Sequence, residues 1–429
     1  MARNRVIYQS EALFVGPTTG GGHNYHKELH RVQSISHDMS ATRTDVFEFG
    51  RLAALDKVMI EAPTVSLDFS YLLTNGENEA NIGLVVENHT SALTAKSKLA
   101  DGLLPNCLSG ILGNPGGAED EKNYYVVTVP EGKDLDGSVN FAGSSYYNPQ
   151  SVVGFGNATL TNYSINGAVG DFASASVSLE AFNISFISGQ TPNIRNNGCW
   201  ISGDAIPTVK KGRDDVVQDG TDNASFNLPS GTTGTQNVFA IRPGDIILDF
   251  EATDTAAAAR RTTTGMLNVG GAVLPGGLDP DHEQEGASAP EPMHVQNFSI
   301  DMPLSRTALT RLGSTFPYYR AIDFPLNVTM NVSALLADVS TGNLVDIMCS
   351  DQKRDIEVAL RDPCSNGQSD QEAKIRSRWL LKNAQLVSQN FSASIGDNKT
   401  VDLSFEGTIG GAEDTENGLF ISGTKNNLS

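Results

Sequence analysis

The sequence predicts a mainly β protein in which one small β domain occurs twice in tandem. The chain has 429 residues, a length that suits two domains, each able to bury its own core. It contains 42 glycines, with 39% hydrophobic and 19% charged residues, a composition that favours turns and strands over long helices. The third observation is an internal repeat, which decides how the domains are divided.

The first repeated block is a strand followed by a turn. The sequence VQSISHDM at Val32–Met39 recurs as VQNFSIDM at Val295–Met302, an offset of 263 residues. Ten of 39 positions are identical over the gap-free block, whereas unrelated sequences of ordinary composition would share about two or three. The same offset pairs Arg43 with Arg306, Gly50 with Gly313, Lys57 with Arg320, and Val65–Ser70 with Val328–Ser333.

A second block repeats in the same order at a different offset. Residues Asn157–Glu180 match Asn383–Glu406 at an offset of 226, with seven of 24 positions identical. The difference between the offsets, 263 − 226 = 37, places 37 extra residues in the first copy, mostly within 75–121. We therefore expect a first domain at 1–195, a linker or insertion at 196–236, and a second domain at 237–429 with a long loop at 253–292.

The repeated blocks predict strands joined by short connections. Leu29–Met39 and Thr64–Leu72 alternate apolar and polar residues, which is typical of half-buried strands. Arg43–Leu55, with Ser40 or Thr42 as its cap, is predicted as a short helix, as is Ala308–Leu312 in the second copy. The second block predicts a hairpin in each copy, 158–186 and 384–409, and a looser pattern matches Tyr124–Val129 to Asp355–Leu360. Each copy would then be a small sheet packed on itself or on one helix, with glycine-rich loops at 75–80, 113–122, 189–234 and 253–292.

Charge and hydropathy exclude several classes of protein. The formal net charge is −20, which argues against a protein that grips nucleic acid, because such binding needs clustered cations. A negative surface would instead let DNA pass without sticking. No apolar run reaches the length of a membrane-spanning helix, and the first residues lack the apolar segment of a signal peptide. The four cysteines show no C-x-x-C pairing, so we expect reduced thiols.

Candidate catalytic and metal-binding residues are few. His23, His26 and His30 are the candidate metal ligands, but their spacing is not that of a zinc site, and a polar loop that contacts a neighbour is the preferred interpretation. Asp134–Gly137 resembles the start of a calcium loop without its bidentate carboxylate. No hydrolase, metalloprotease or phosphate-binding motif is present. We expect neither an enzyme nor a cofactor.

Matched polar residues flank the turn after the repeated strand. Asp38 and Arg43 in the first copy correspond to Asp301 and Arg306 in the second. Each pair either fixes the turn locally, as an exposed ion pair worth about 0–1 kcal/mol, or sends its arginine across an interface between equivalent domains. The sequence leaves both interpretations open, and Gly50 and Gly313 join these four residues as turn or interface candidates.

The repeated motif resembles that of phage tail tube (major tail) proteins. The resemblance is carried by Val-Gln-x-x-Ser-x-Asp-Met, then Arg-Thr, a glycine and the strand VSLDFS, and it is closest over Leu29–Leu73. It covers the two repeat cores and leaves the long loops unmatched. The family fold is a β-sandwich or barrel with a flanking helix, so the resemblance implies two such tail-tube domains here.

The resemblance also implies function and partners. Tail tube proteins form rings, usually sixfold, whose inner sheets line the channel for DNA ejection, so three two-domain chains would fill one pseudo-hexameric ring. The implied partners are further copies of the chain, the tape-measure protein, and sheath, tail terminator and baseplate proteins, in a virion assembled in the host cytoplasm. An adaptor ring (terminator, baseplate or hub) and a β-sandwich surface-binding protein are the alternatives, the latter disfavoured because Trp200 and Trp379 are the only tryptophans.

Overall fold

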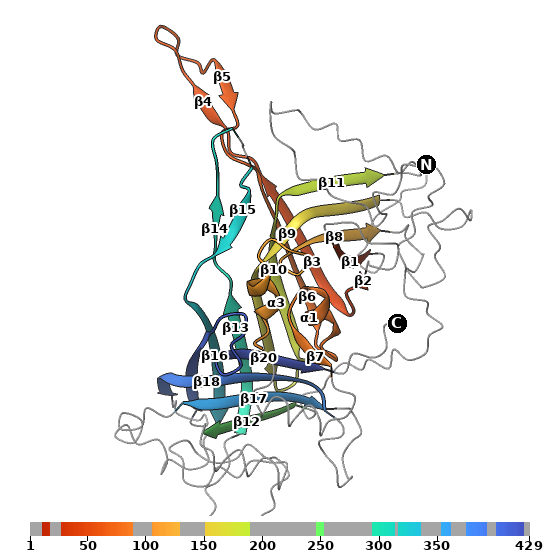
Figure 1. Ribbon diagram of the computed structural model, residues 1–429, viewed down its shortest axis with the longest axis vertical. Helices are drawn as coiled ribbons and strands as arrows, with labels where there is room; N and C mark the ends of the chain where they lie inside the picture. The colour runs from red at the N-terminus through yellow and green to blue at the C-terminus, as the bar shows by residue number, and fades with distance from the viewer. Residues whose placement is uncertain are drawn as a thin grey trace, which may run out of the picture.

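The computed structural model describes residues 11–17, 27–88, 105–128, 151–188, 246–252, 294–313, 316–335, 353–361, 375–392 and 400–423. These residues form a mainly β structure, which confirms the predicted fold class (Figure 1). The predicted domain limits at 196–236 and the long loop at 253–292 lie outside the described residues, as do His23, His26 and Asp134–Gly137.

The first half of the chain contains eleven strands and two short helices among the described residues. In chain order they are β1 (Glu11–Pro17), β2 (Lys27–Glu28), β3 (Val32–Ser40), β4 (Thr44–Val46), β5 (Asp56–Val58), β6 (Thr64–Leu72), α1 (Glu77–Asn81), β7 (Val86–Asn88), α3 (Ser109–Gly113), β8 (Glu121–Thr128), β9 (Ser151–Ala168), β10 (Ser174–Ala181) and β11 (Asn183–Ser188).

The second half is made of strands in the part that the structure describes. They are β12 (Ile246–Ala252), β13 (His294–Pro303), β14 (Arg306–Leu309), β15 (Tyr319–Ile322), β16 (Leu326–Leu335), β17 (Arg354–Arg361), β18 (Ile375–Ser392), β19 (Thr400–Ile409) and β20 (Gly418–Gly423). Both described helices thus belong to the first half, and the helix expected in each copy is not found among the described residues of the second.

The two halves arrange their strands in the same order. The sheet runs β12-β17-β18-β19-β16-β13 through the second half and continues β9-β10-β6-β3 in the first, where β8 and β1 extend from β9. Each half has one long strand, β9 or β18, whose beginning pairs with β8 or β17 and whose remainder pairs with β10 or β19. The hairpins predicted from the second repeated block are therefore present.

Backbone details agree between the halves as well. Asn157 in β9 and Asn383 in β18 both have left-handed backbones, with φ of 53° and 55°. The Asn157 N–H donates to Oδ1 of Asn123 and the Asn383 N–H donates to Oδ1 of Asp355, each at 3.0 Å. Asn123 therefore corresponds to Asp355, and the pattern match that set Tyr124 against Asp355 is wrong by one residue.

Three predicted elements are wrong. Neither Arg43–Leu55 nor Ala308–Leu312 is a helix: β4 and β5 form a hairpin, and β14 and β15 form another in the second half. Gly50 and Gly313 lie at the tips with φ of 89° and 87°, a left-handed conformation that ends a helix and suits a turn. The segment 75–80, predicted as a loop, instead contains the start of α1, whose residues Glu77–Glu79 are buried.

The alternating pattern of the strands builds one continuous core. Leu67, Phe69 and Tyr71 of β6 are buried with Met330 and Val332 of β16 in the same cluster. Burying such side chains contributes about 1.5–3 kcal/mol each before conformational entropy is subtracted. Because the cluster contains residues of both halves, the two halves share one hydrophobic core.

Candidate assembly interface

The two halves meet where β13 pairs with the far part of β9, Asn162–Ala168. Seven residue pairs join the strands in antiparallel register, from Asn297 opposite Ala168 to Pro303 opposite Asn162. Phe298, Ile300 and Met302 alternate toward the core and are at most 4% exposed. The chain thus contains one complete strand-to-strand junction between its two repeated halves.

Gly167 on β9 leaves room for the side chain of Phe298. A Cβ on Gly167 would lie 2.5 Å from Cε1 of Phe298, closer than real Cβ contacts. Phe298 and Gly167 stand opposite each other in the ladder, so the ring lies across the glycine. The absence of a side chain at residue 167 is a packing requirement of this junction.

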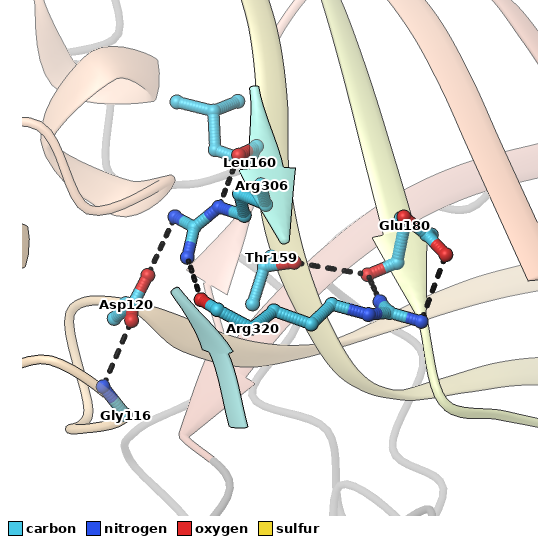
Figure 2. Close-up of polar contacts among 7 residues, drawn as sticks. All are labelled: Gly116, Asp120, Thr159, Leu160, Glu180, Arg306 and Arg320. Atoms are coloured by element: carbon cyan, nitrogen blue, oxygen red, sulfur yellow. Dashed lines mark hydrogen bonds and ion pairs between the residues drawn. The ribbon is translucent and has the colours of Figure 1, made fainter. Parts of the chain in front are cut away.

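Two arginines from the hairpin β14–β15 fasten it to the first half (Figure 2). Arg306 places Nη2 2.6 Å from Oδ1 of Asp120, and its Nε donates to the Leu160 carbonyl at 3.0 Å. Both side chains of this pair are at most 1% exposed. Oδ2 of Asp120 accepts a further bond from the Gly116 N–H at 2.8 Å, so both carboxylate oxygens are satisfied.

Arg320 makes the second contact. Its Nη1 donates to the Glu180 carbonyl at 2.8 Å and its Nη2 lies 2.9 Å from Oε1 of Glu180. The guanidinium also lies over the Phe182 ring, 4.1 Å from the centroid, where a cation is attracted to the ring face. The pKa of Arg320 is lowered by burial, which the Glu180 carboxylate opposes.

The residues inserted in the first copy hold the second half from another side. Strand β7 pairs in parallel with β20. Just before α3, the Cys107 N–H donates to the Leu419 carbonyl at 2.7 Å and Nδ2 of Asn106 donates to the Gly411 carbonyl at 2.9 Å. We call α1, β7 and Asn106–Gly113 the clamp; among the described residues it occurs once per chain.

A buried polar network runs from the clamp into the second half. Oε1 of Glu79 accepts bonds from the hydroxyls of Tyr71, at 2.9 Å, and Tyr163, at 3.2 Å. Nε1 of Trp379 in β18 donates to the Tyr163 hydroxyl at 3.2 Å. Burial raises the pKa of the Glu79 carboxyl, although the two tyrosine hydrogen bonds lower it.

The strands equivalent to β13 and β9 are β3 and β18. Within the described residues, β3 pairs only with β6, and the far part of β18, Gln385–Ser392, pairs only with β19. Met39 on β3 is 54% exposed, whereas its equivalent Met302 is fully buried. Val387 on β18 is 62% exposed and Phe391 is 42% exposed. These are exposed edges with apolar side chains, which can pair with another strand.

The hairpin β4–β5 is also exposed. In Figure 1 it projects from one end of the molecule, whereas β14–β15 lies beside the first half. Phe49 and Leu52 near its tip are fully exposed, and Phe47 and Ile60 are 64% exposed. Scattered apolar side chains are normal on a surface, but a projecting apolar hairpin is typical of a contact site.

The residues singled out in the sequence fall into different environments. Asp38 is exposed on β3, and Arg43 is exposed at the start of the hairpin β4–β5. Asp301 lies on β13 opposite Ser164 of β9, and Arg306 lies between the two halves. Asp120 and Glu79 were not identified from the sequence, because their partners are distant in it. Arg320 and Glu180 carried a signal, since both occupy repeat-matched positions.

The histidine metal site is described only in part. His30 donates its backbone N–H to Oδ1 of Asn78 at 2.9 Å, and its Nε2 lies 3.5 Å from Oε1 of Glu77. Burial lowers the pKa of His30, but the hydrogen bond and charge of Glu77, together with the charge of Glu28, raise it, and the net shift of the pKa is upward. Within the described part of the chain there is no cluster of three metal-ligating side chains and no helix long and apolar enough to cross a membrane.

Comparison with solved structures returns a tail tube and a baseplate. No family model and no curated protein matches the sequence. The SPP1 tail tube is similar with a TM-score of 0.23 and 10% identity, over 43% of this chain and 80% of that one. The baseplate of the anti-feeding prophage is similar with a TM-score of 0.23 and 7% identity, over 43% of this chain and 96% of that one. A TM-score this low does not establish a shared fold.

Proposed function

We propose that this protein is a structural component of a phage tail that assembles with itself into stacked rings, forming the tail tube through which DNA is ejected. The observation that carries the proposal is the pairing of β13 with β9 inside the chain. Among the described residues, the equivalent edges on β3, which pairs only with β6, and on residues 385–392 of β18, which pair only with β19, remain exposed. A chain with two complementary ends associates head to tail, giving a closed ring or an open filament.

The tandem repeat sets the proposed stoichiometry. The repeated motif resembles a family whose rings usually contain six domains, so three chains with two domains each would complete one ring. Closing the ring would cover the exposed edges of β3 and β18, which otherwise favour aggregation. We therefore propose a trimer with pseudo-sixfold symmetry, and stacking of such trimers into a tube.

The charge of the chain suits a conduit. A net charge of −20 repels DNA, which lets it slide without sequence-specific binding. The proposed partners are those of a tail tube: further rings, the tape-measure protein, and sheath, terminator and baseplate proteins. The proposal assigns the chain no enzymatic activity.

Electron microscopy and native mass spectrometry of the purified full-length chain test the proposal. We expect tubes of stacked rings, and a species near 137 kDa, three times the 45.6 kDa chain. Single rings that never stack would instead favour a tail terminator, baseplate or hub ring. Monomers at all concentrations would contradict both, and would favour the β-sandwich surface-binding protein.

A further inference from the structure

The exposed strands β3 and β18 have the same ladder registers as their equivalents in the internal junction, β13 and β9. Strand β3 pairs with β6 through a register shift between Val32 and Ser34, and β13 pairs with β16 through a shift between Val295 and Asn297. These shifts stand at equivalent positions, 263 residues apart. Ile35 opposite Phe69 in the first half likewise corresponds to Phe298 opposite Val332 in the second.

The receiving strands agree in the same way. Asn162 of β9 lies opposite Ser178 of β10, and Ser388 of β18 lies opposite Ser404 of β19. Each pair is followed by a register shift, and the residues are related by the offset of 226. The far part of β18 therefore offers an incoming strand the ladder that β9 offers to β13.

We propose that β3 of one chain pairs with the far part of β18 in a second copy of this chain, in the register that joins β13 to β9. The inference rests on the proposed self-assembly and specifies its contacts. Transferring the internal register gives five antiparallel pairs between described residues: Ser36 with Ser392, His37 with Phe391, Asp38 with Asn390, Met39 with Gln389, and Ser40 with Ser388.

The exposed hairpin adds a charged contact to this interface. Arg320 on β15 corresponds to Lys57 on β5, and Glu180 on β10 corresponds to Glu406 on β19. Glu180 lies between Thr159 and Ser66 in the ladder, and Glu406 lies between their equivalents, Gln385 and Thr329. With β3 seated on β18, the hairpin β4–β5 brings Lys57 to Glu406 as β14–β15 brings Arg320 to Glu180.

The interface between chains lacks two features of the internal one. The clamp occurs once among the described residues and already holds the second half of its own chain. At the offset that relates Asn123 to Asp355, Asp120 corresponds in sequence to Gln352, so Arg43 has no carboxylate equivalent to the partner of Arg306. The proposed junction between chains therefore has fewer stabilising contacts than the internal one.

Cysteine cross-linking tests the register in the full-length chain. Directly opposed Cα atoms in an antiparallel ladder are about 4.5–5.5 Å apart, which suits a disulfide. We expect Ser36→Cys with Ser392→Cys to yield, under mild oxidation, dimers and a closed trimer that resist SDS without reductant. The matched control is Ser36→Cys with Asn390→Cys, displaced by two residues on the same face, together with the parent chain.

The outcomes separate this inference from the proposed function. Rings in the microscope without cross-linking of the matched pair, or with equal linking of the displaced pair, would overturn the register and leave the function standing. A chain that forms neither rings nor cross-links, yet has the circular dichroism of the parent, would contradict both.

A charge exchange tests the hairpin contact independently. We expect Glu406→Lys to raise the concentration for half-maximal ring assembly roughly fivefold, since it sets two cations together. Adding Lys57→Glu should restore assembly, because the pair is then reversed. Glu413→Lys, an equal charge change at an exposed residue off the proposed interface, is the control. No rescue by the double exchange, or an equal effect at Glu413, would refute the contact.

Discussion

The internal junction and the exposed edges differ far more in environment than in geometry. Arg306 is buried against Asp120, while Arg43, its equivalent, is exposed. Met302 is buried and the identical residue Met39 is half exposed. The backbone positions are retained while burial changes. The difference indicates that Met302 and Arg306 are buried because β9 and Asp120 of the first half cover them, whereas Met39 and Arg43 receive no such cover from the described residues of one chain.

The largest expected effect separates the buried ion pair of Arg306 from the exposed ion pair of Lys57. Asp120→Ala leaves the buried Arg306 guanidinium uncompensated, so we expect it to lower the free energy of unfolding by about 3–5 kcal/mol. Asp45→Ala removes the exposed partner that lies 3.3 Å from Lys57 and should change it by less than about 1 kcal/mol. Urea denaturation of both variants measures the contrast; equal losses would show that the buried Arg306–Asp120 pair contributes no more to stability than the exposed Lys57–Asp45 pair.

Met302 and Met39 occupy equivalent positions and extend the comparison of the internal junction with the exposed edge. Met302→Ala removes a fully buried side chain and should cost about 2–5 kcal/mol of unfolding free energy. Met39→Ala, the same change at the equivalent position, should cost less than about 0.5 kcal/mol in the isolated chain and should weaken ring assembly. Thermal unfolding of the dilute chain and light scattering of the concentrated chain report the two effects. A large loss of stability in dilute Met39→Ala would contradict the comparison.

The packing of Phe298 on Gly167 gives a smaller effect. Gly167→Ala places a Cβ against the ring, and we expect a loss of about 1–3 kcal/mol. Phe298→Ile introduces the residue found at the matched position of β3, Ile35, and should recover much of that loss in the double variant. A double-mutant cycle in urea measures the coupling, and additive losses would argue against this contact.

The buried network predicts a dependence on pH. The pKa of Glu79 is raised in the folded chain, so its contribution to stability is fully present below its unfolded pKa and is lost as pH rises through the folded pKa. Glu79→Gln keeps a carbonyl acceptor and removes the titration. Its stability relative to the parent should therefore increase with pH, by up to about 1.4 kcal/mol per pH unit. Urea denaturation of the variant and the parent at a series of pH values from 5 to 8 measures this difference. A difference in unfolding free energy that does not change with pH would contradict the prediction.

Sequence reasoning identified the strands whose pattern repeats and missed the elements that depend on distant partners. β3, β6, β9 and β10 alternate apolar and polar residues, and their equivalents repeat that pattern, so periodicity was enough. The polar segment Glu77–Glu79 has the composition of a loop, yet His30, Tyr71 and Tyr163 supply partners that allow its burial.

The hairpin and the ion pairs show the same limit. Ser40, Thr42 and Gly50 are acceptable helix boundaries, and nothing local in Arg43–Leu55 distinguishes a helix from two short strands on an exposed arm. Arg306 could be identified as a candidate because it is repeat-matched. Its partner Asp120 is 186 residues away and has no charged equivalent in the second copy, so the repeat gave no indication of it.

The clamp would change how fast the proposed ring nucleates. Two domains joined by a clamp meet at an effective concentration that no dilution lowers. Six separate domains need five encounters between molecules before the ring closes on itself, whereas three clamped chains need two. Assembly then depends on a lower power of protein concentration, and a half-built ring has fewer places from which to lose a subunit.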